Sequence, residues 1–223
     1  MNTPLPPQIG FELIYSFVII ACSLIVYRTT KEMYDLSSYK GIKFFRQAFL
    51  FFAVAYFSRY FIQFFLLSLN LNSILEFSPF FIGLISLFVF LYSSSMAIFS
   101  LLYSMMWKKW GDSKPRNLLF HALAIVIAAI GLSVRGAEMY LLLNIVILGF
   151  VCSVLFVAYK DSKKKKKDNS LFMIYLLLSI FWILNVVDVL LPNFLELFQL
   201  IIYLISISLF MVILYKVLRK SGN

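Results

Sequence analysis

Residues 47–69 read QAFLFFAVAYFSRYFIQFFLLSL, a stretch in which Arg59 is the single charged residue. A helix needs about 20 apolar residues to cross a hydrocarbon core of roughly 30 Å. A charge at the centre of such a helix costs a few kcal/mol or more, unless it faces the interior of a helix bundle and finds a partner there. The segment therefore predicts a membrane-spanning helix, and Arg59 is the first candidate functional residue.

Six further apolar segments surround this helix and nearly exhaust the chain of 223 residues. The chain is 62% hydrophobic and 18% aromatic, with a mean hydropathy of +0.93. A soluble domain with this composition would aggregate. We therefore predict an all-α integral membrane protein, a single seven-helix transmembrane domain over residues 1–223, with helices at 11–27, 47–69, 79–106, 117–134, 137–159, 170–191 and 194–218.

The basic residues indicate how these helices are oriented. All lysines and arginines except Arg59 and Arg135 lie after the first, third and fifth helices or at the C-terminal end. Cytoplasmic loops carry the excess of basic residues, so the N-terminus is predicted outside and the C-terminus in the cytoplasm. The net charge of +10 thus reports the topology of a multi-pass cell-membrane protein, and we expect no binding to nucleic acid.

The cytoplasmic connections suggest contacts with lipid and protein. Residues 28–46 mix bases with Tyr34, Leu36 and Phe44, which predicts a short helix lying in the membrane interface. A second basic run either determines topology or also binds anionic lipid headgroups. It consists of Lys163, Lys164, Lys165, Lys166 and Lys167. Because no segment is long enough to be an output domain, a cytoplasmic protein partner would have to engage these connections.

Polar residues gather in the outer half of the predicted bundle. Their depth follows from the direction of each helix and a rise of about 1.5 Å per residue. Gln63 lies one turn outward from Arg59, and Asn185 and Asp188 share a face of the sixth helix. The candidate ligand-binding residues are Arg59, Gln63, Asn144, Asn185, Asp188, Gln199 and Tyr203.

Arg59 and Asp188 are predicted to form an ion pair, because polar groups in hydrocarbon need partners and arginine can extend several Å outward. The pair could be structural, fixing helix packing while Gln63 and Asn185 complete its hydrogen bonds. Alternatively, the same groups line an outward-facing, water-filled pocket for a small polar ligand, with Phe and Leu side chains forming its cytoplasmic floor. A third hypothesis is a proton or ion relay through Asp188.

Each of four external segments also has one acidic residue near the membrane edge: Glu12, Glu76, Glu138 and Glu196. Acids are tolerated at an edge from which bases are excluded, and this explains them without a function. If these side chains converge, they would instead draw cationic solutes toward the mouth of the bundle.

Two sequence patterns concern helix packing. Small residues recur near helical spacing within 79–106, which predicts close approach of a neighbouring helix. They are Gly83, Ser86, Ser93, Ala97, Ser100 and Ser104. In addition, residues 75–90 and 195–210 share seven identities in sixteen positions. A parallel 3+1+3 duplication would explain this similarity and predicts two superpositions, Cys22 on Cys152 and Ser86 on Ser206.

Catalytic and metal-binding motifs are absent from the sequence. It contains no His-Glu-x-x-His, no Gly-x-Ser-x-Gly and no phosphate-binding loop. His121 is the single histidine and has no cysteine or acid at ligand spacing. Cys22 and Cys152 lie inside predicted helices, as packing thiols do. We therefore expect neither catalysis, nor a cofactor, nor a bound metal.

These observations favour a receptor-like or sensory seven-helix membrane protein that binds a small polar ligand in an outward-facing pocket. A small-solute or proton-coupled transporter with a 3+1+3 helix repeat is the first alternative. Against transport, the predicted helices have no proline breaks and the inner half offers little polar path. The second alternative is a non-catalytic membrane scaffold or assembly subunit.

Overall fold

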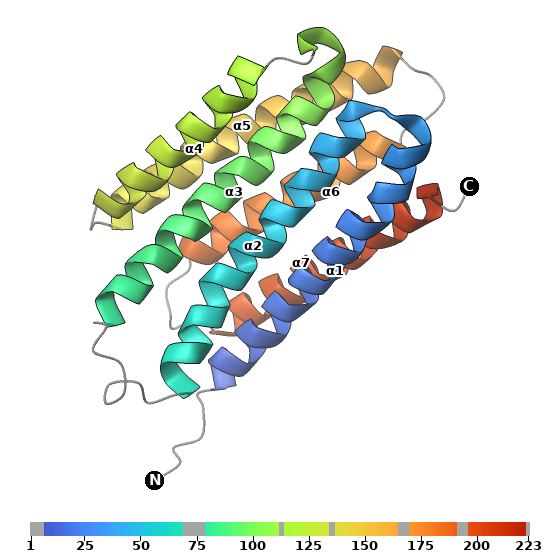
Figure 1. The fold of residues 1–223 in the computed structure, drawn as a ribbon. Helices are drawn as coiled ribbons and strands as arrows, with labels where there is room; N and C mark the ends of the chain where they lie inside the picture. Colours follow the sequence, from blue (N-terminus) through green and yellow to red (C-terminus); the bar gives the residue numbers. More distant parts are fainter. Residues whose placement is uncertain are drawn as a thin grey trace.

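The computed structural model describes residues 7–68, 79–111, 114–133, 137–164, 170–190 and 196–221. Within these ranges, several side chains near helix ends, including those of residues 61–68, 137–144 and 161–164, lie outside the description. The described residues form seven α-helices, which confirms the predicted all-α class (Figure 1). They are α1 (Pro7–Ser37), α2 (Lys40–Ser68), α3 (Pro79–Trp110), α4 (Lys114–Ser133), α5 (Ala137–Lys164), α6 (Ser170–Leu190) and α7 (Glu196–Ser221).

Four helical segments within the described residues are long and apolar enough to cross a membrane: Gly10–Ser37, Gly83–Lys108, Pro115–Ser133 and Leu197–Lys220. Two shorter apolar helices accompany them, Ile145–Lys160 and Phe172–Asp188. The start of α1 and the end of α7 lie at opposite ends of the bundle (Figure 1). The chain is therefore a multi-pass helical membrane protein.

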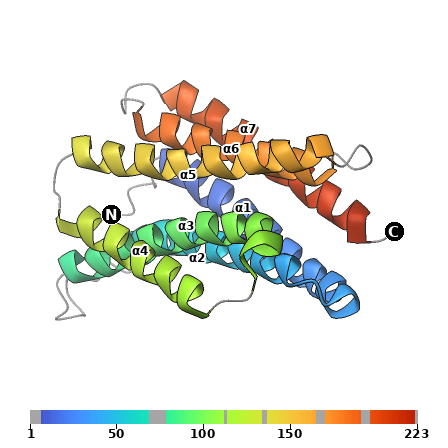
Figure 2. The same ribbon diagram turned by 90° about the horizontal axis from the view of Figure 1, so that it is seen from above.

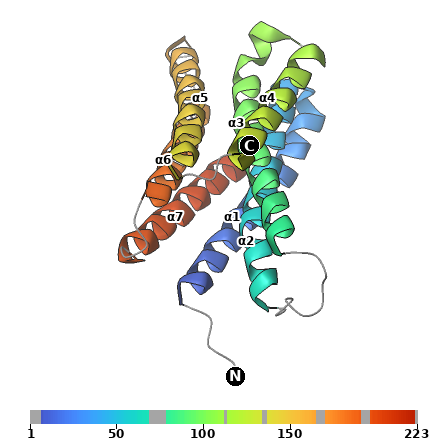
Figure 3. The same cartoon turned by 90° about the vertical axis from the view of Figure 1, so that its left-hand side faces the viewer.

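Six of the described helices form a closed ring in the order α1, α2, α3, α5, α6, α7 and back to α1. The remaining helix, α4, lies on the outside against α3 and touches α5 more weakly (Figure 2). α7 runs obliquely to the other helices and packs against both α6 and α1 (Figure 3). In this ring α2 and α6 are opposite members, so side chains that join them reach across the interior.

The connection between α1 and α2 differs from the prediction. Residues 28–46 form no separate interfacial helix, because α1 continues to Ser37 and α2 begins at Lys40. Ser38 adopts a positive φ of 50° at the turn. Arg46 Nε donates to the Tyr27 carbonyl at 2.9 Å and its guanidinium lies 4.1 Å from the centre of that ring. Because no proline lies between residues 28 and 46, these residues extend α1 and α2 as two long helices. The contact between Arg46 and Tyr27 links the two helices.

Close packing of α3 against α2 confirms the predicted role of the small residues. Every residue from Ser93 to Leu101 is buried. The Ser86 hydroxyl donates to the Ser58 carbonyl at 2.5 Å, and the Ser104 hydroxyl donates to the Gly41 carbonyl at 2.7 Å. These bonds satisfy serine hydroxyls against the backbone of α2. Gly83 is exposed and takes no part in this contact.

Candidate functional site

Arg59 and Asp188 meet across the interior of the ring, as predicted. Arg59 Nη2 lies 3.8 Å from Asp188 Oδ2, and the two side chains are 26% and 7% exposed. This separation exceeds the roughly 2.7–2.9 Å of a charge-assisted hydrogen bond. The two atoms therefore attract each other through their charges without closing a direct bond.

Four buried tyrosines from three helices surround this pair. Tyr15 of α1 stacks on Tyr203 of α7, with 4.8 Å between ring centres. Tyr56 and Tyr60 of α2 are stacked at 6.1 Å, and Tyr15 presents its edge to both at 5.6 and 6.3 Å. The Arg59 guanidinium carbon lies 5.0 Å from the centre of the Tyr60 ring. The charged pair therefore lies beside aromatic faces.

Asn185 binds the tyrosines instead of the ion pair. Its Oδ1 accepts from the Tyr56 hydroxyl at 2.6 Å and from the Tyr15 hydroxyl at 3.4 Å, and these two hydroxyls are 3.0 Å apart. Its amide nitrogen donates to the Phe181 carbonyl at 2.8 Å. The expectation that Asn185 completes the hydrogen bonds of the ion pair is therefore wrong. Asn185 lies one turn inward from Asp188, where the hydroxyls of Tyr15 and Tyr56 are nearer to its side chain than the ion pair is.

A second acid joins the site from α1. The Tyr203 hydroxyl donates to Glu12 Oε1 at 3.3 Å, and the Asp188 carboxyl also neighbours that tyrosine. Glu12 thus does converge on the polar residues of the bundle. The side chains of Glu76, Glu138 and Glu196 lie outside the described residues.

Three buried polar atoms in this region have no hydrogen-bond partner within the protein: Asp188 Oδ1, the Tyr60 hydroxyl and the Ser206 hydroxyl. Their residues are 8%, 3% and 0% exposed. The Ser206 side chain lies beside Tyr15, on the same face of α7 as Tyr203, without making a hydrogen bond of normal length and angle to it. An unpaired buried polar group costs about 1–3 kcal/mol and needs an explanation in a native structure.

We refer to these residues together as the outer cluster, since they lie in the half of the bundle that holds the N-terminus. Its members are Glu12, Tyr15, Tyr56, Arg59, Tyr60, Asn185, Asp188, Tyr203 and Ser206. Gln199, also predicted, is half-buried one turn outward from Tyr203. The predicted side chains of Gln63, Asn144 and Lys163 to Lys167 lie outside the described residues.

Phenylalanines close the inward side of the outer cluster. Phe181 and Phe210 are 4.5 Å apart between ring centres, and Phe52 lies 6.3 and 6.2 Å from them. Phe49 extends the group from α2, at 6.4 Å from Phe210. These rings come from α2, α6 and α7, three of the four helices predicted to supply the floor of Phe and Leu side chains; the floor, like the pocket above it, stays a prediction.

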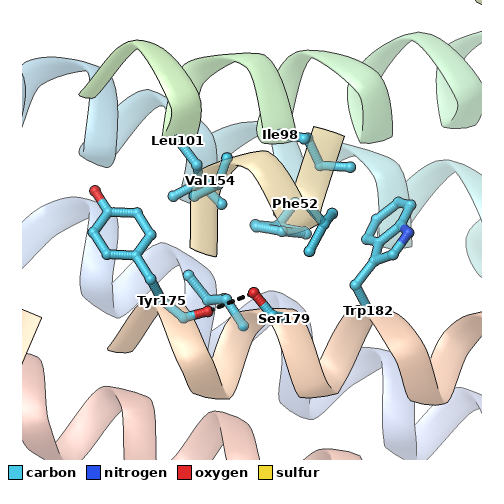
Figure 4. Close-up of a pocket in the computed structure, with 9 residues that line it drawn as sticks. Phe52, Ile98, Leu101, Val154, Tyr175, Ser179 and Trp182 are labelled. Atoms are coloured by element: carbon cyan, nitrogen blue, oxygen red, sulfur yellow. Dashed lines mark hydrogen bonds between the residues drawn. The ribbon is translucent and has the colours of Figure 1, made fainter. Parts of the chain in front are cut away.

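A narrow cavity of about 10 Å³, room for no more than about one water molecule, lies further inward, between α2 and α3 on one side and α5 and α6 on the other (Figure 4). Its lining is mostly apolar, and the Ser179 hydroxyl on its wall is bonded to the Tyr175 carbonyl at 2.8 Å. Neither Asp188 nor Tyr203 lines this cavity, so it is not the predicted ligand pocket. The predicted pocket at the outer cluster stays a prediction.

The two cysteines are free and occupy different surroundings. Cys22 is buried with its sulfur 3.9 Å from the sulfur of Met211, as a packing thiol is. Cys152 is exposed on the surface of α5, so an interior packing role for it is wrong. Ser86 and Ser206 are both buried. Of the two pairs that the duplication predicts to be equivalent, only the serines share an environment.

Sequence reasoning missed Tyr15, Tyr56 and Tyr60, which supply most of the aromatic surface. A signal was present, because Tyr56 and Tyr60 are spaced i, i+4 around Arg59 and so share one helix face. A tyrosine hydroxyl in the membrane interior needs a partner by the same argument that singled out Arg59.

A full-length comparison shows the family of the chain. An uncharacterized protein of Archaeoglobus fulgidus is 32% identical to it over 228 residues, a match that covers 97% of this chain and 96% of the relative. The chain belongs to the same family as this archaeal protein. No protein-family model and no solved structure matches the sequence. The similarity thus extends over nearly the whole length of both chains.

Proposed function

We propose that this protein is a receptor-like or sensory membrane protein that binds a small polar ligand at the outer cluster. One observation carries the proposal: Asp188 Oδ1 and the hydroxyls of Tyr60 and Ser206 are buried and unpartnered. A polar network that served only to fix helix packing would stabilise the fold best with all its members paired. Unpaired groups in a network that is otherwise bonded are the groups that a ligand would satisfy.

The arrangement of the helices supports a sensing role. The outer cluster draws residues from α1, α2, α6 and α7, and its central pair joins α2 to α6 across the ring. A ligand held between these helices would change how closely the two sides approach. Each of the four helices continues to the opposite end of the bundle, where the change would reach the cytoplasm.

The cytoplasmic end supplies a basic surface for the output. Lys31, Lys40, Lys43 and Lys108 are exposed at the ends of α1, α2 and α3. In the proposed orientation they face anionic lipid headgroups or an acidic protein partner. We propose anionic lipid as the partner of the run Lys163 to Lys167 as well, on the basis of its sequence alone. The proposed function involves no catalysis and no nucleic acid.

A ligand screen on the purified protein tests the proposal. Small polar solutes of each charge class are added to the detergent-solubilised protein, and the unfolding temperature is measured. A binder should raise it in the wild type, because a ligand that binds only the folded state stabilises that state. The effect should vanish in Asp188→Asn and persist in Glu32→Gln, a matched change at an exposed acid near the far end of α1. Equal responses in both variants would contradict binding at the outer cluster.

A transporter is the second candidate, and the order of the ring favours it. If α1 is exchanged with α5, α2 with α6 and α3 with α7, each pair of helices that are neighbours in the ring becomes another pair of neighbours. The ring therefore has the two-fold order that a 3+3 repeat would give. The pair Arg59–Asp188 joins α2 and α6, which this exchange interchanges. Repeat transporters bind their substrates at such an interface. Solute uptake by proteoliposomes that contain only this protein would establish transport and replace the receptor proposal.

A further inference from the structure

We propose that the outer cluster selects a small organic cation that carries N–H donors, such as a primary ammonium or a guanidinium group. The inference rests on the proposed function, because it names the chemical class of the ligand that the outer cluster would bind. It follows from the charges, the unpaired atoms and the aromatic faces of the site.

The charges of the outer cluster do not balance. Glu12 and Asp188 approach Tyr203 from α1 and α6, whereas Arg59 is the one base in the cluster. With all three groups ionised, the acids exceed the base by one. An uncompensated charge is costly in a medium of low dielectric constant, where charges also interact strongly. One additional positive charge would neutralise the site.

The unpaired atoms match the donors of a cation. Asp188 Oδ1 can only accept when ionised, and the hydroxyls of Tyr60 and Ser206 each have free acceptor capacity. An ammonium group offers three donors and no acceptor, and a guanidinium group offers up to five donors and no acceptor. A carboxylate ligand would instead place its charge beside two acids and leave Asp188 Oδ1 unsatisfied.

The aromatic rings provide a third, independent match. Cations bind over aromatic faces within about 6 Å of the ring centre. Arg59 already shows this contact within the site, since its guanidinium carbon lies 5.0 Å from the Tyr60 ring centre and 5.6 Å from that of Phe90. Stacked Tyr15 and Tyr203 offer further aromatic surface beside the two acids. The phenylalanine floor limits the depth that a ligand can reach, so the bound group must be small.

Fluorescence can report on this site in the intact protein. Of the three tryptophans, Trp107 and Trp110 lie at the far end of α3, while buried Trp182 lies one turn inward from Asn185. Replacing Trp107 and Trp110 with Phe leaves Trp182 as the single reporter. Binding is then measured as the change in Trp182 emission in detergent micelles, and confirmed by isothermal titration calorimetry on the unmodified chain.

Five probes separate the ligand classes. Methylammonium and methylguanidinium are cations with N–H donors, and tetramethylammonium is a cation without them. Methylurea is a neutral analogue of methylguanidinium, and acetate is the anion. We expect saturable binding of at least one of the first two, at least tenfold weaker binding of tetramethylammonium, and no binding of methylurea or acetate.

Variants of the acids and of the base test the same inference, because they should change the affinity for a cation in opposite directions. Glu12→Gln and Asp188→Asn should each weaken cation binding by about tenfold or more, since each removes an acid that attracts the cation. Arg59→Gln should strengthen cation binding, since it removes the positive charge that repels the ligand, and Glu32→Gln should have no effect. Thermal unfolding shows whether each variant folds. Glu12 is only half-buried, so its variant keeps the test valid if Asp188→Asn does not fold.

The outcomes distinguish this inference from the proposed function. If acetate binds and Arg59→Gln abolishes that binding, the ligand is anionic: the proposed function stands and this inference falls. If Trp182 responds to pH alone and to none of the probes, a proton supplies the missing charge, and this inference also falls. If none of the five probes binds while another solute of the thermal-unfolding screen does, this inference falls and the proposed function stands; if that screen gives no response either, both proposals fail.

Discussion

The side chain of Arg59 has its nearest charged and aromatic neighbours on α6 and α2, which are opposite each other in the ring. Its guanidinium faces the Asp188 carboxylate at 3.8 Å and the Tyr60 ring at 5.0 Å, while about a quarter of the side chain stays exposed. Asp188 is nearly buried, so most of the cost of desolvation falls on the acid. The pair therefore stabilises the fold chiefly by compensating the charge of Asp188.

The energy of this pair can be measured by a double-mutant cycle. Arg59→Gln and Asp188→Asn should each lower the free energy of unfolding by about 1–3 kcal/mol, below the 3–5 kcal/mol of fully buried pairs because Arg59 is partly exposed. The double variant should recover part of the loss. Chemical unfolding in detergent micelles gives the three values. Strictly additive losses would mean that the two side chains do not interact.

Tyr56 and Tyr60 form a matched pair for a second test at the residue scale. The Tyr56 hydroxyl donates to Asn185 at 2.6 Å, whereas the Tyr60 hydroxyl has no partner. Tyr56→Phe should therefore destabilise the protein by about 1–2 kcal/mol, and Tyr60→Phe should be neutral or stabilising. Tyr60→Phe should instead weaken ligand binding. Equal losses of stability would show that the Tyr60 hydroxyl is bonded in the folded protein.

At the scale of elements, α3 is the helix around which the first half of the bundle packs. It lies against α2, α4 and α5, and its serines bond to the backbone of α2. Small side chains allow this approach, because helices in lipid associate through close contact and not through a hydrophobic driving force. The same small residues were visible in the sequence, but the neighbour that uses them was not.

Enlarging one small residue on α3 tests this packing. Ala97 is fully buried, so Ala97→Leu should cost about 1–3 kcal/mol through overpacking. Ala129 is exposed on α4, and Ala129→Leu should have little effect there. Both variants add the same atoms to a helix, and thermal unfolding compares them. A larger loss from the α4 variant would contradict the observed arrangement.

For the whole molecule, the basic residues are concentrated at one of the two ends of the bundle, the end at which the odd-numbered helices terminate. The C-terminal ends of α1, α3, α5 and α7 gather at one end of the bundle, opposite the start of α1 (Figure 1). The positive-inside rule assigns that end to the cytoplasm. The outer cluster would then lie nearer the external surface.

Cysteine labelling in intact cells tests this orientation. In a chain with Cys22 and Cys152 replaced by alanine, single cysteines at Ser38, Ser113 and Ser162 should resist membrane-impermeant thiol reagents. A cysteine at Ser73 should react. Detergent permeabilisation is the control, since it should make all four reactive. Labelling of the first three in intact cells would reverse the orientation and place the outer cluster toward the cytoplasm.

The sequence by itself determined the seven helices, the assignment to the multi-pass membrane proteins and the pairing of Arg59 with Asp188. These depend on local composition, on helix length and on the cost of leaving a charge alone in hydrocarbon. Depth along each helix follows from a constant rise, so residues at one depth could be grouped before their neighbours were known.

Only the tertiary structure decided which face each helix turns inward. In a membrane both the lipid-facing and the interior positions are apolar, so the pattern that marks a buried face in a soluble protein is weak here. For this reason the sequence did not predict that Tyr15 belongs to the outer cluster or that Asn185 accepts hydrogen bonds from tyrosines. Nor did it predict that Cys152 is exposed. The order of helices in the ring, and with it the placing of Glu12 beside Tyr203, likewise depended on packing between segments far apart in the chain.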